Sequence, residues 1–123
     1  VMHMIGGLML AMIFQPAHVM EDHEFIENDR EVIEESYESH QLTTTSNFAP
    51  TNKILTWYCG GLNYQVEHHI FPNVSHVHYP AISSIVKETA REFSLPYRSV
   101  ASLREALKIH QRTLRKLGDP AWT

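Results

Sequence analysis

The chain has 123 residues, of which 43% are hydrophobic and 20% are charged, so its composition permits a single domain of modest size. A formal net charge of -4 argues against nucleic acid as a partner. The single cysteine, Cys59, excludes an internal disulfide and favours a reducing compartment.

Residues 1–20 form the first predicted element, which contains no charged residue. Because a spanning helix needs about 20 mostly apolar residues, we expect a transmembrane helix here. The segment lacks the basic start and the small-residue cleavage site of a signal peptide. A buried core helix of a non-enzymatic interaction domain is the other interpretation. Polar groups in a membrane helix usually mark a site, although the end of a helix entering water is the other interpretation of His18. Because a second histidine cluster follows downstream, we treat His18 as a candidate metal ligand.

Residues 21–63 form an acidic segment followed by a connector. In the stretch 21–38, nine acidic residues face one base, Arg30, and apolar residues at helical spacing predict a helix exposed to solvent. The polar stretch 43–47 predicts the end of that helix. Between residues 54 and 64, aromatic residues surround two glycines, which is typical of a bend at a membrane interface or of an ordinary aromatic core.

Two amphipathic helices are predicted toward the C-terminal end. Pro80 suits the first turn of one helix, and Ser94 with the residues after it ends that helix. Ser102 and Glu105 form the capping-box pattern of the next helix, and Gly118 ends it. No strand pattern competes, so the predicted fold class is all-α. The apolar faces consist of Ile82, Ile85, Val86, Ala90 and Phe93 in the first helix, and Leu103, Leu107, Leu114 and Leu117 in the second.

A histidine-rich stretch opens the third segment, residues 64–123. On a helix, Gln65 lies three residues before His68 and four before His69, so all three side chains reach one side. The two histidines diverge by about 100°, which suits two ligands of two neighbouring metals. Neutral imidazole binds iron, copper, nickel or zinc, whereas a glutamine amide is a weak ligand. Without further context, a surface or hydrogen-bonded histidine pair is the commoner explanation.

The longer string GGLNYQVEHHIFP, at residues 60–72, resembles the last histidine box of membrane fatty-acid desaturases. The similarity is to the front-end, acyl-lipid and linoleoyl-CoA types, in which glutamine replaces the first histidine. Further similar stretches are QPAHV at 15–19, TTSNF at 44–48 and SHVHYPAI at 75–82. The resemblance extends over about residues 14–117 and implies a four-helix membrane enzyme, with residues 1–20 as its last membrane helix and a cytosolic helical cap.

The resemblance also implies a histidine-rich diiron centre that uses dioxygen to desaturate a fatty-acyl chain carried on a lipid or on CoA. Electrons would come from a donor such as cytochrome b5 or ferredoxin. His68 and His69 would bind iron on the cytosolic side of the membrane, and His18 would be an additional ligand. The positions that would ligate more weakly or support the ligands are Gln65, His76, His78, Asn63 and Glu67.

Two boxes of the family, of HxxxH and HxxHH type, do not occur in these 123 residues. We therefore expect the remaining ligands upstream in a longer protein, and no catalytic activity from this segment alone. Two alternatives stay open. One is a fatty-acid hydroxylase of the same superfamily, and the other is a non-redox helical module that binds zinc or nickel through clustered histidines.

Overall fold

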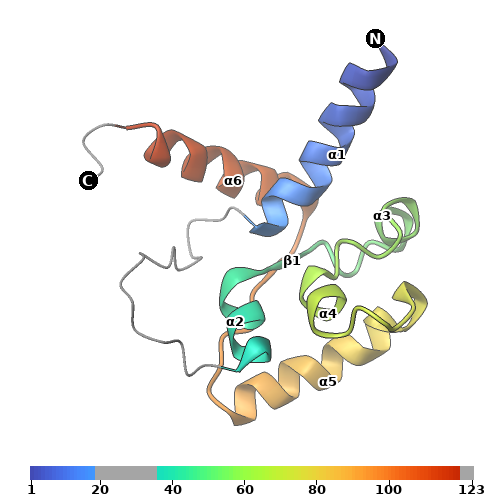
Figure 1. Cartoon of the computed structure of the whole chain (residues 1–123), viewed down its shortest axis with the longest axis vertical. Coiled ribbons are helices and arrows are strands. Elements are labelled where there is room, and N and C mark those ends of the chain that lie inside the picture. Colours follow the sequence, from blue (N-terminus) through green and yellow to red (C-terminus); the bar gives the residue numbers. More distant parts are fainter. Residues whose placement is uncertain (19–35, 120–123) are drawn as a thin grey trace.

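The computed structural model describes residues 1–18 and 36–119. Within these ranges the chain is mostly helical, and its helices surround a short strand pair (Figure 1). The predicted acidic helix at 21–38 lies almost wholly outside the described residues. The elements are α1 (Met2–His18), α2 (Tyr37–Thr44), β1 (Asn47–Phe48), α3 (Lys53–Tyr58), α4 (Gln65–Ile70), the 3-10 turn η1 (His76–His78), α5 (Tyr79–Glu92), β2 (Ser99–Val100) and α6 (Leu103–Leu117).

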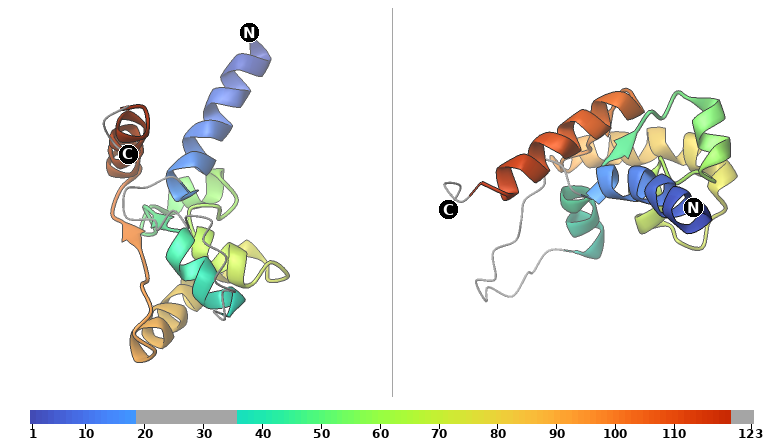
Figure 2. Two further views of the ribbon diagram at one scale, coloured as in Figure 1. Left: turned by 60° about the vertical axis from the view of Figure 1, so that its left-hand side comes forward. Right: turned by 90° about the horizontal axis from the view of Figure 1, so that it is seen from above.

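The first helix, α1, projects from the body formed by the other elements (Figures 1 and 2). Pro16 and Ala17, just before its last residue, are buried, whereas its N-terminal side chains are exposed. The helix predicted at 1–20 is therefore present, but its described part has 17 residues. In residues 1–18 and 36–119, no helix combines the length and the apolar character that crossing a membrane requires. The transmembrane helix predicted from the sequence included residues 19 and 20, which lie outside the described ranges.

The chain is mostly helical, as predicted, but it also contains a parallel strand pair, β1–β2, that the sequence analysis did not expect. Asn47 pairs with Ser99, and Phe48 pairs with Val100. The backbone N–H of Asn47 donates to the Arg98 carbonyl over 3.0 Å. Each strand has only two residues, so no alternation of apolar and polar positions could reveal it in the sequence.

The buried segment 45–49, which contains β1, ties the end of α1 to the beginning of α4. The Ser46 amide donates to the Ala17 carbonyl over 3.1 Å, next to His18. On the other side, the Phe48 amide donates to the Asn63 carbonyl over 3.0 Å, two residues before α4. Figure 1 shows β1 at the centre of the molecule, with α1, α2 and α4 around it.

The predicted helix ends agree with the structure. The Ser102 hydroxyl accepts a hydrogen bond from the Glu105 amide over 3.2 Å, and Gly118 caps the other end of α6. Helix α5 has Pro80 in its first turn and ends at Glu92, before the predicted stop. Helix α2 ends at Thr44, inside the polar connector.

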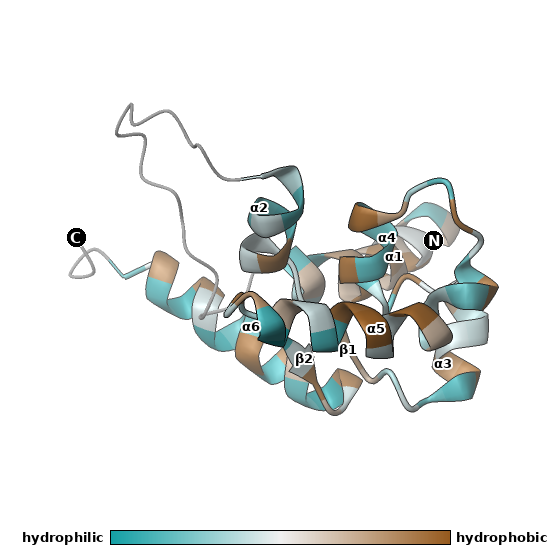
Figure 3. Ribbon diagram, turned by 90° about the horizontal axis from the view of Figure 1, so that it is seen from below, coloured by the Kyte–Doolittle hydropathy of each residue, from teal (hydrophilic) through white to brown (hydrophobic). Residues whose placement is uncertain are grey.

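The apolar faces of α5 and α6 are only partly buried. Apolar and polar residues alternate along both helices (Figure 3). In α5, Val86 and Ala90 pack with Leu42 and Val66, but Ile85 and Phe93 are 65% and 71% exposed. In α6, the buried residues are Ala106, His110 and Thr113. Leu114 and Leu117, which were predicted to lie on the buried face, are exposed. The predicted face of α5, by contrast, is present in part, through Ile82, Val86 and Ala90.

Gly61 forms the bend that was predicted before the histidine motif. Its φ is 77°, and a Cβ atom placed there would lie 2.6 Å from the His76 Cβ. We expect Gly61→Ala to lower the free energy of unfolding by about 3 kcal/mol, the sum of left-handed backbone strain and a steric clash. Thermal or denaturant unfolding of the purified protein measures this loss.

Gly60→Ala is the matched control, because Gly60 also has a positive φ but a Cβ atom added there would meet no other atom within 4 Å. Its expected loss is the backbone cost alone, about 1 kcal/mol. Equal losses at both positions would contradict the close packing of Gly61 on η1.

Candidate metal centre

Helix α4 carries the histidine motif, and its first turn is held by the buried Asn47. The Val66 amide, one of the N-terminal groups that a helix leaves without an internal partner, donates to the Asn47 Oδ1 over 2.9 Å. Gln65, Val66 and Glu67 are buried, whereas His68 and His69 are partly exposed at the other end of the helix. The helix is therefore fixed at its beginning and presents imidazoles at its end.

The structure brings the three predicted ligands together from two helices. The ring centroids of His18 and His69 are 5.1 Å apart, and those of His68 and His69 are 5.8 Å apart. The rings of His68 and His69 are nearly perpendicular, at 82°. The end of α1 and the end of α4 thus form one cluster of imidazoles, although 47 positions separate His18 from Gln65 in the sequence.

Gln65 lies between two of these rings. Its amide nitrogen is 3.1 Å from the Nε2 of His18 and 3.0 Å from the Nε2 of His69. An amide nitrogen has two N–H donors, so both imidazole nitrogens can present lone pairs to it. Two lone pairs that converge on one partially positive group form an arrangement that a metal cation also requires.

His69 is held in the tautomer that suits a ligand. Its Nδ1–H donates to the Oε1 of Gln41 over 2.7 Å, which leaves the lone pair on Nε2, facing Gln65. Burial, together with the charges of His18 and His68, lowers the pKa of His69 and favours the neutral ring. A neutral imidazole with an oriented Nε2 is the form that binds metal.

His68 has a different supporting partner. Its Nδ1 lies 3.2 Å from the hydroxyl oxygen of Tyr79, the buried first residue of α5. Tyr37 reaches the same region, because its hydroxyl donates to the backbone carbonyl of His69 over 3.1 Å. The two histidines of α4 are thus oriented from α5 and α2 respectively.

The other predicted site residues face elsewhere. The side-chain Nδ2 of Asn63 donates to the Ala49 carbonyl over 3.3 Å and to the Thr56 hydroxyl over 3.0 Å, inside the bend before α4. His76 and His78 lie exposed on η1, where His76 packs against Gly61. Asn63 and His76 therefore contact the bend before the histidine motif.

Glu67 is fully buried on the side of α4 that faces β1. One carboxylate oxygen accepts a hydrogen bond from the Asn47 side-chain Nδ2 over 2.7 Å, and the other accepts one from the Tyr97 hydroxyl over 2.7 Å. Burial raises the pKa of Glu67, while these two hydrogen bonds oppose the rise. Burial also raises the pKa of Tyr97, which keeps its hydroxyl a donor.

The residues that the structure brings together fit part of a metal centre. In the described ranges, no group of three or more His, Cys, Asp or Glu side chains is placed so that it could hold a metal ion by itself. The fit lies in the donor set: two Nε2 atoms face one point, and a third imidazole stands beside them. Neutral imidazole is a good ligand for iron.

Sequence reasoning missed four residues that support the cluster, which are Gln41, Asn47, Tyr79 and Tyr97. Asn47 and Tyr79 lie in stretches that carry the desaturase resemblance. The sequence therefore marked their positions as notable but did not indicate what the two side chains do. Gln41 and Tyr97 lie outside those stretches and reach the site only through folding. No local pattern could have revealed them.

Comparison with known proteins identifies the family of the chain. The family model described as fatty acid desaturase matches residues 1–101. The chain belongs to the fatty acid desaturase family. Membership assigns this desaturase segment to lipid metabolism. No solved structure matches it.

Several desaturases are similar to nearly the whole chain. The sn-1 linoleoyl-lipid 6-desaturase of Synechocystis sp. is 39% identical over 120 residues, which are 96% of this chain and 33% of that protein. The acyl-lipid (8-3)-desaturase of Physcomitrium patens is 42% identical over 115 residues, which are 94% of this chain and 24% of that protein. An acyl-lipid (8-3)-desaturase of Mortierella alpina is 36% identical, over 94% of this chain and 26% of that protein. The desaturase segment therefore spans about a third or less of the length of these relatives.

Gln41→Leu tests the support of His69. Loss of the Nδ1–H acceptor should weaken iron binding by about 10-fold, a typical effect of removing a partner that orients a ligand. Iron content of the full-length protein after equilibration with limiting Fe²⁺ measures the change. Gln111→Leu, at an exposed position of α6, is the control and should bind iron like the unaltered protein. Equal iron content in both variants would show that Gln41 does not orient His69.

Proposed function

We propose that this chain supplies part of the iron-binding centre of an oxygen-dependent fatty-acid desaturase, which introduces a double bond into an acyl chain. The observation that carries the proposal is the convergence of His18 and His69 on one point, with His68 beside them. Membership of the desaturase family supports the same assignment.

In this proposal His18, His68 and His69 are iron ligands, and further ligands come from a longer protein. Iron, when bound, would supply the oxidant made from dioxygen that an unactivated C–H bond requires. The protein's own contribution is orientation: Gln41 fixes the tautomer of His69, and Tyr79 holds His68. Gln65, only 3% exposed, stands between the rings as a weak ligand or as a donor that moves aside.

The proposed location of the enzyme is the membrane, with α1 in the bilayer and the histidine motif on the cytosolic side. Most apolar side chains of α1 face outward, including Met4, Ile5 and Leu8. Exposed apolar side chains also occur on α3, where Ile54 is 80% and Trp57 is 81% exposed. Aromatic residues of this kind are favoured at membrane surfaces. The Tyr58 hydroxyl contacts the Met9 sulfur over 3.3 Å, which links α3 to α1.

The proposed substrate is a fatty-acyl chain carried on a membrane lipid. The similar proteins of Physcomitrium patens and Mortierella alpina are named acyl-lipid desaturases, and that of Synechocystis sp. is named for a linoleoyl-lipid. The electron donor would be cytochrome b5 or ferredoxin, which deliver electrons singly to the metal centre.

A fatty-acid profile tests the reaction. The full-length protein would be expressed in a host fed saturated, monounsaturated and diunsaturated acyl precursors, beside a variant with both His68→Ala and His69→Ala. We expect a new double bond in the lipids of the first culture and none in the second, because two ligands are lost together.

His3→Ala is the matched control, since His3 lies exposed on α1 away from the cluster and its loss should leave the product unchanged. An oxygenated product would favour the hydroxylase alternative. No new product from a well-expressed, iron-loaded protein would favour the non-redox metal-binding alternative.

A further inference from the structure

A hydrogen-bonded triangle of side chains lies behind the histidine motif. The Asn47 Nδ2 donates to Glu67 over 2.7 Å and to the Tyr97 hydroxyl over 2.8 Å, and that hydroxyl donates to Glu67 over 2.7 Å. Asn47 and Glu67 are fully buried. A carboxylate in such a position must accept hydrogen bonds from the protein, because water cannot replace them.

Asn47 holds α4 at two points. Its Oδ1 accepts from the Val66 amide, while its Nδ2 donates to the side chain of Glu67. The backbone of Asn47 is itself fixed, because it belongs to β1 and pairs with Ser99 of β2. Backbone and side-chain contacts on adjacent residues restrain rotation of a helix about its axis as well as its position.

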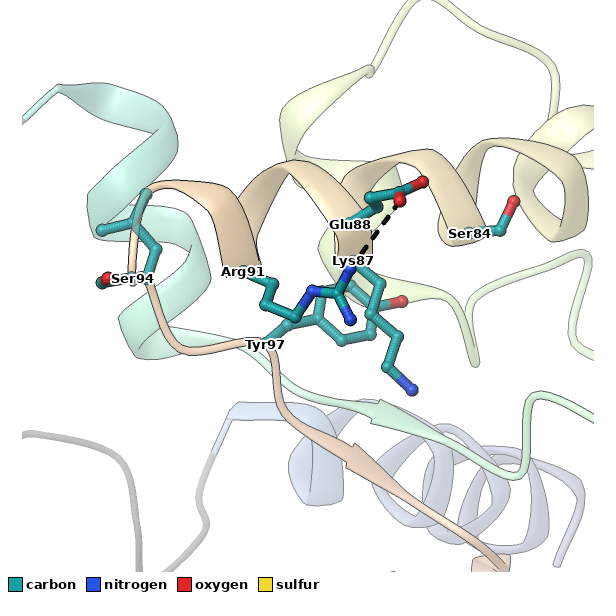
Figure 4. A pocket seen from close by; sticks show the side chains of 7 residues that line it. Ser84, Lys87, Glu88, Arg91, Ser94 and Tyr97 are labelled. Carbon is teal, nitrogen blue, oxygen red and sulfur yellow. Dashed lines mark ion pairs between the residues drawn. The ribbon is translucent and has the colours of Figure 1, made fainter.

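Tyr97 approaches Glu67 from the segment between α5 and β2. It lines a cleft of about 580 Å³ together with Ser84, Lys87, Glu88, Arg91 and Ser94. Figure 4 shows these side chains. Arg91 pairs with Glu88 over 3.8 Å at this cleft. In the described part of the chain Glu67 forms no ion pair, so Asn47 and Tyr97 are the side chains that stabilise its carboxylate.

The direction of Glu67 determines where the imidazoles point. On a helix, consecutive side chains are separated by about 100°, so Glu67 bound toward β1 leaves His68 and His69 directed to other sides. His69 then meets His18, and His68 meets Tyr79. A rotation of α4 would separate His69 from both Gln41 and His18, which lie on other helices.

We propose that Asn47 and Tyr97 are positioning residues: they hold Glu67 and thereby fix the rotation of α4, so that His68 and His69 meet His18 in a geometry that binds iron. This inference rests on the proposed function, because it assigns the triangle to the same iron centre. The triangle contributes no ligand and acts through the helix.

An isosteric exchange of charge tests the proposal in the purified full-length protein. Asn47→Asp places two carboxylates side by side, and Glu67→Gln leaves the Tyr97 hydroxyl without its anionic acceptor. The double variant restores one amide and one carboxylate and keeps the acceptor for the Val66 amide. Because all three variants preserve side-chain size, packing alone does not distinguish them.

We expect Asn47→Asp to lower the iron content at limiting Fe²⁺ by about 10-fold, as losses around a metal ligand typically do. The double variant should recover most of that loss. Tyr97→Phe should lower iron content less than Asn47→Asp, and kcat should fall with it while KM for the acyl substrate stays constant. Gln111→Leu changes an exposed side chain of α6 outside the triangle and should match the unaltered protein.

Thermal unfolding of each variant separates positioning from general stability. The proposal is overturned if folded variants lose thermal stability but keep iron content and kcat. It is also overturned if the iron content of the double variant is as low as that of Asn47→Asp. If Asn47→Asp does not fold, Glu67→Gln and Tyr97→Phe carry the same comparison. If the unaltered protein binds iron but makes no unsaturated product, the proposed function falls, and iron content still decides whether the triangle positions α4.

Discussion

The arrangement of the candidate metal centre depends on one buried polar segment, residues 45–49. The backbone N–H of Ser46 donates a hydrogen bond to the Ala17 carbonyl at the end of α1. The Asn47 side chain forms hydrogen bonds with the start of α4. Pairing with β2 then anchors the segment itself. Buried polar groups need such partners, because each unsatisfied group costs about 1–3 kcal/mol. The same hydrogen bonds that make burial of Asn47 acceptable therefore set the distance between His18 and the histidines of α4.

This constraint explains why a small assembly of short helices can orient three imidazoles. Helix α4 has six residues, too few for much stability of its own. Partners from α2, α5 and the β1–β2 pair supply what the helix lacks: Gln41 and Tyr79 fix individual rings, and Asn47 fixes the helix. Rigidity at the ends of α1 and α4 is what a metal centre requires, since ligands must be held close to their bound geometry.

The sequence predicted those features that local patterns encode. Ser102 with Glu105 marked the start of α6, and the box around His68 and His69 marked the family. The strand pair was missed because two residues carry no period, and Gln41 and Tyr97 were missed because their roles arise only from long-range contacts. The membrane crossing of residues 1–20 stays a prediction. The apolar face of α5 was predicted in part, through Val86 and Ala90, whereas Leu114 and Leu117 were wrongly placed on the buried face of α6, where Ala106 and Thr113 are buried instead.

X-ray absorption at the iron edge of the purified full-length protein tests the central claim most directly, because it counts the imidazole nitrogens bound to iron. The account predicts a nitrogen-rich centre whose imidazole signal falls when His18 is replaced by alanine, since α1 and α4 contribute ligands to one site. An oxygen-dominated centre, or an imidazole signal that does not change on loss of His18, would contradict it.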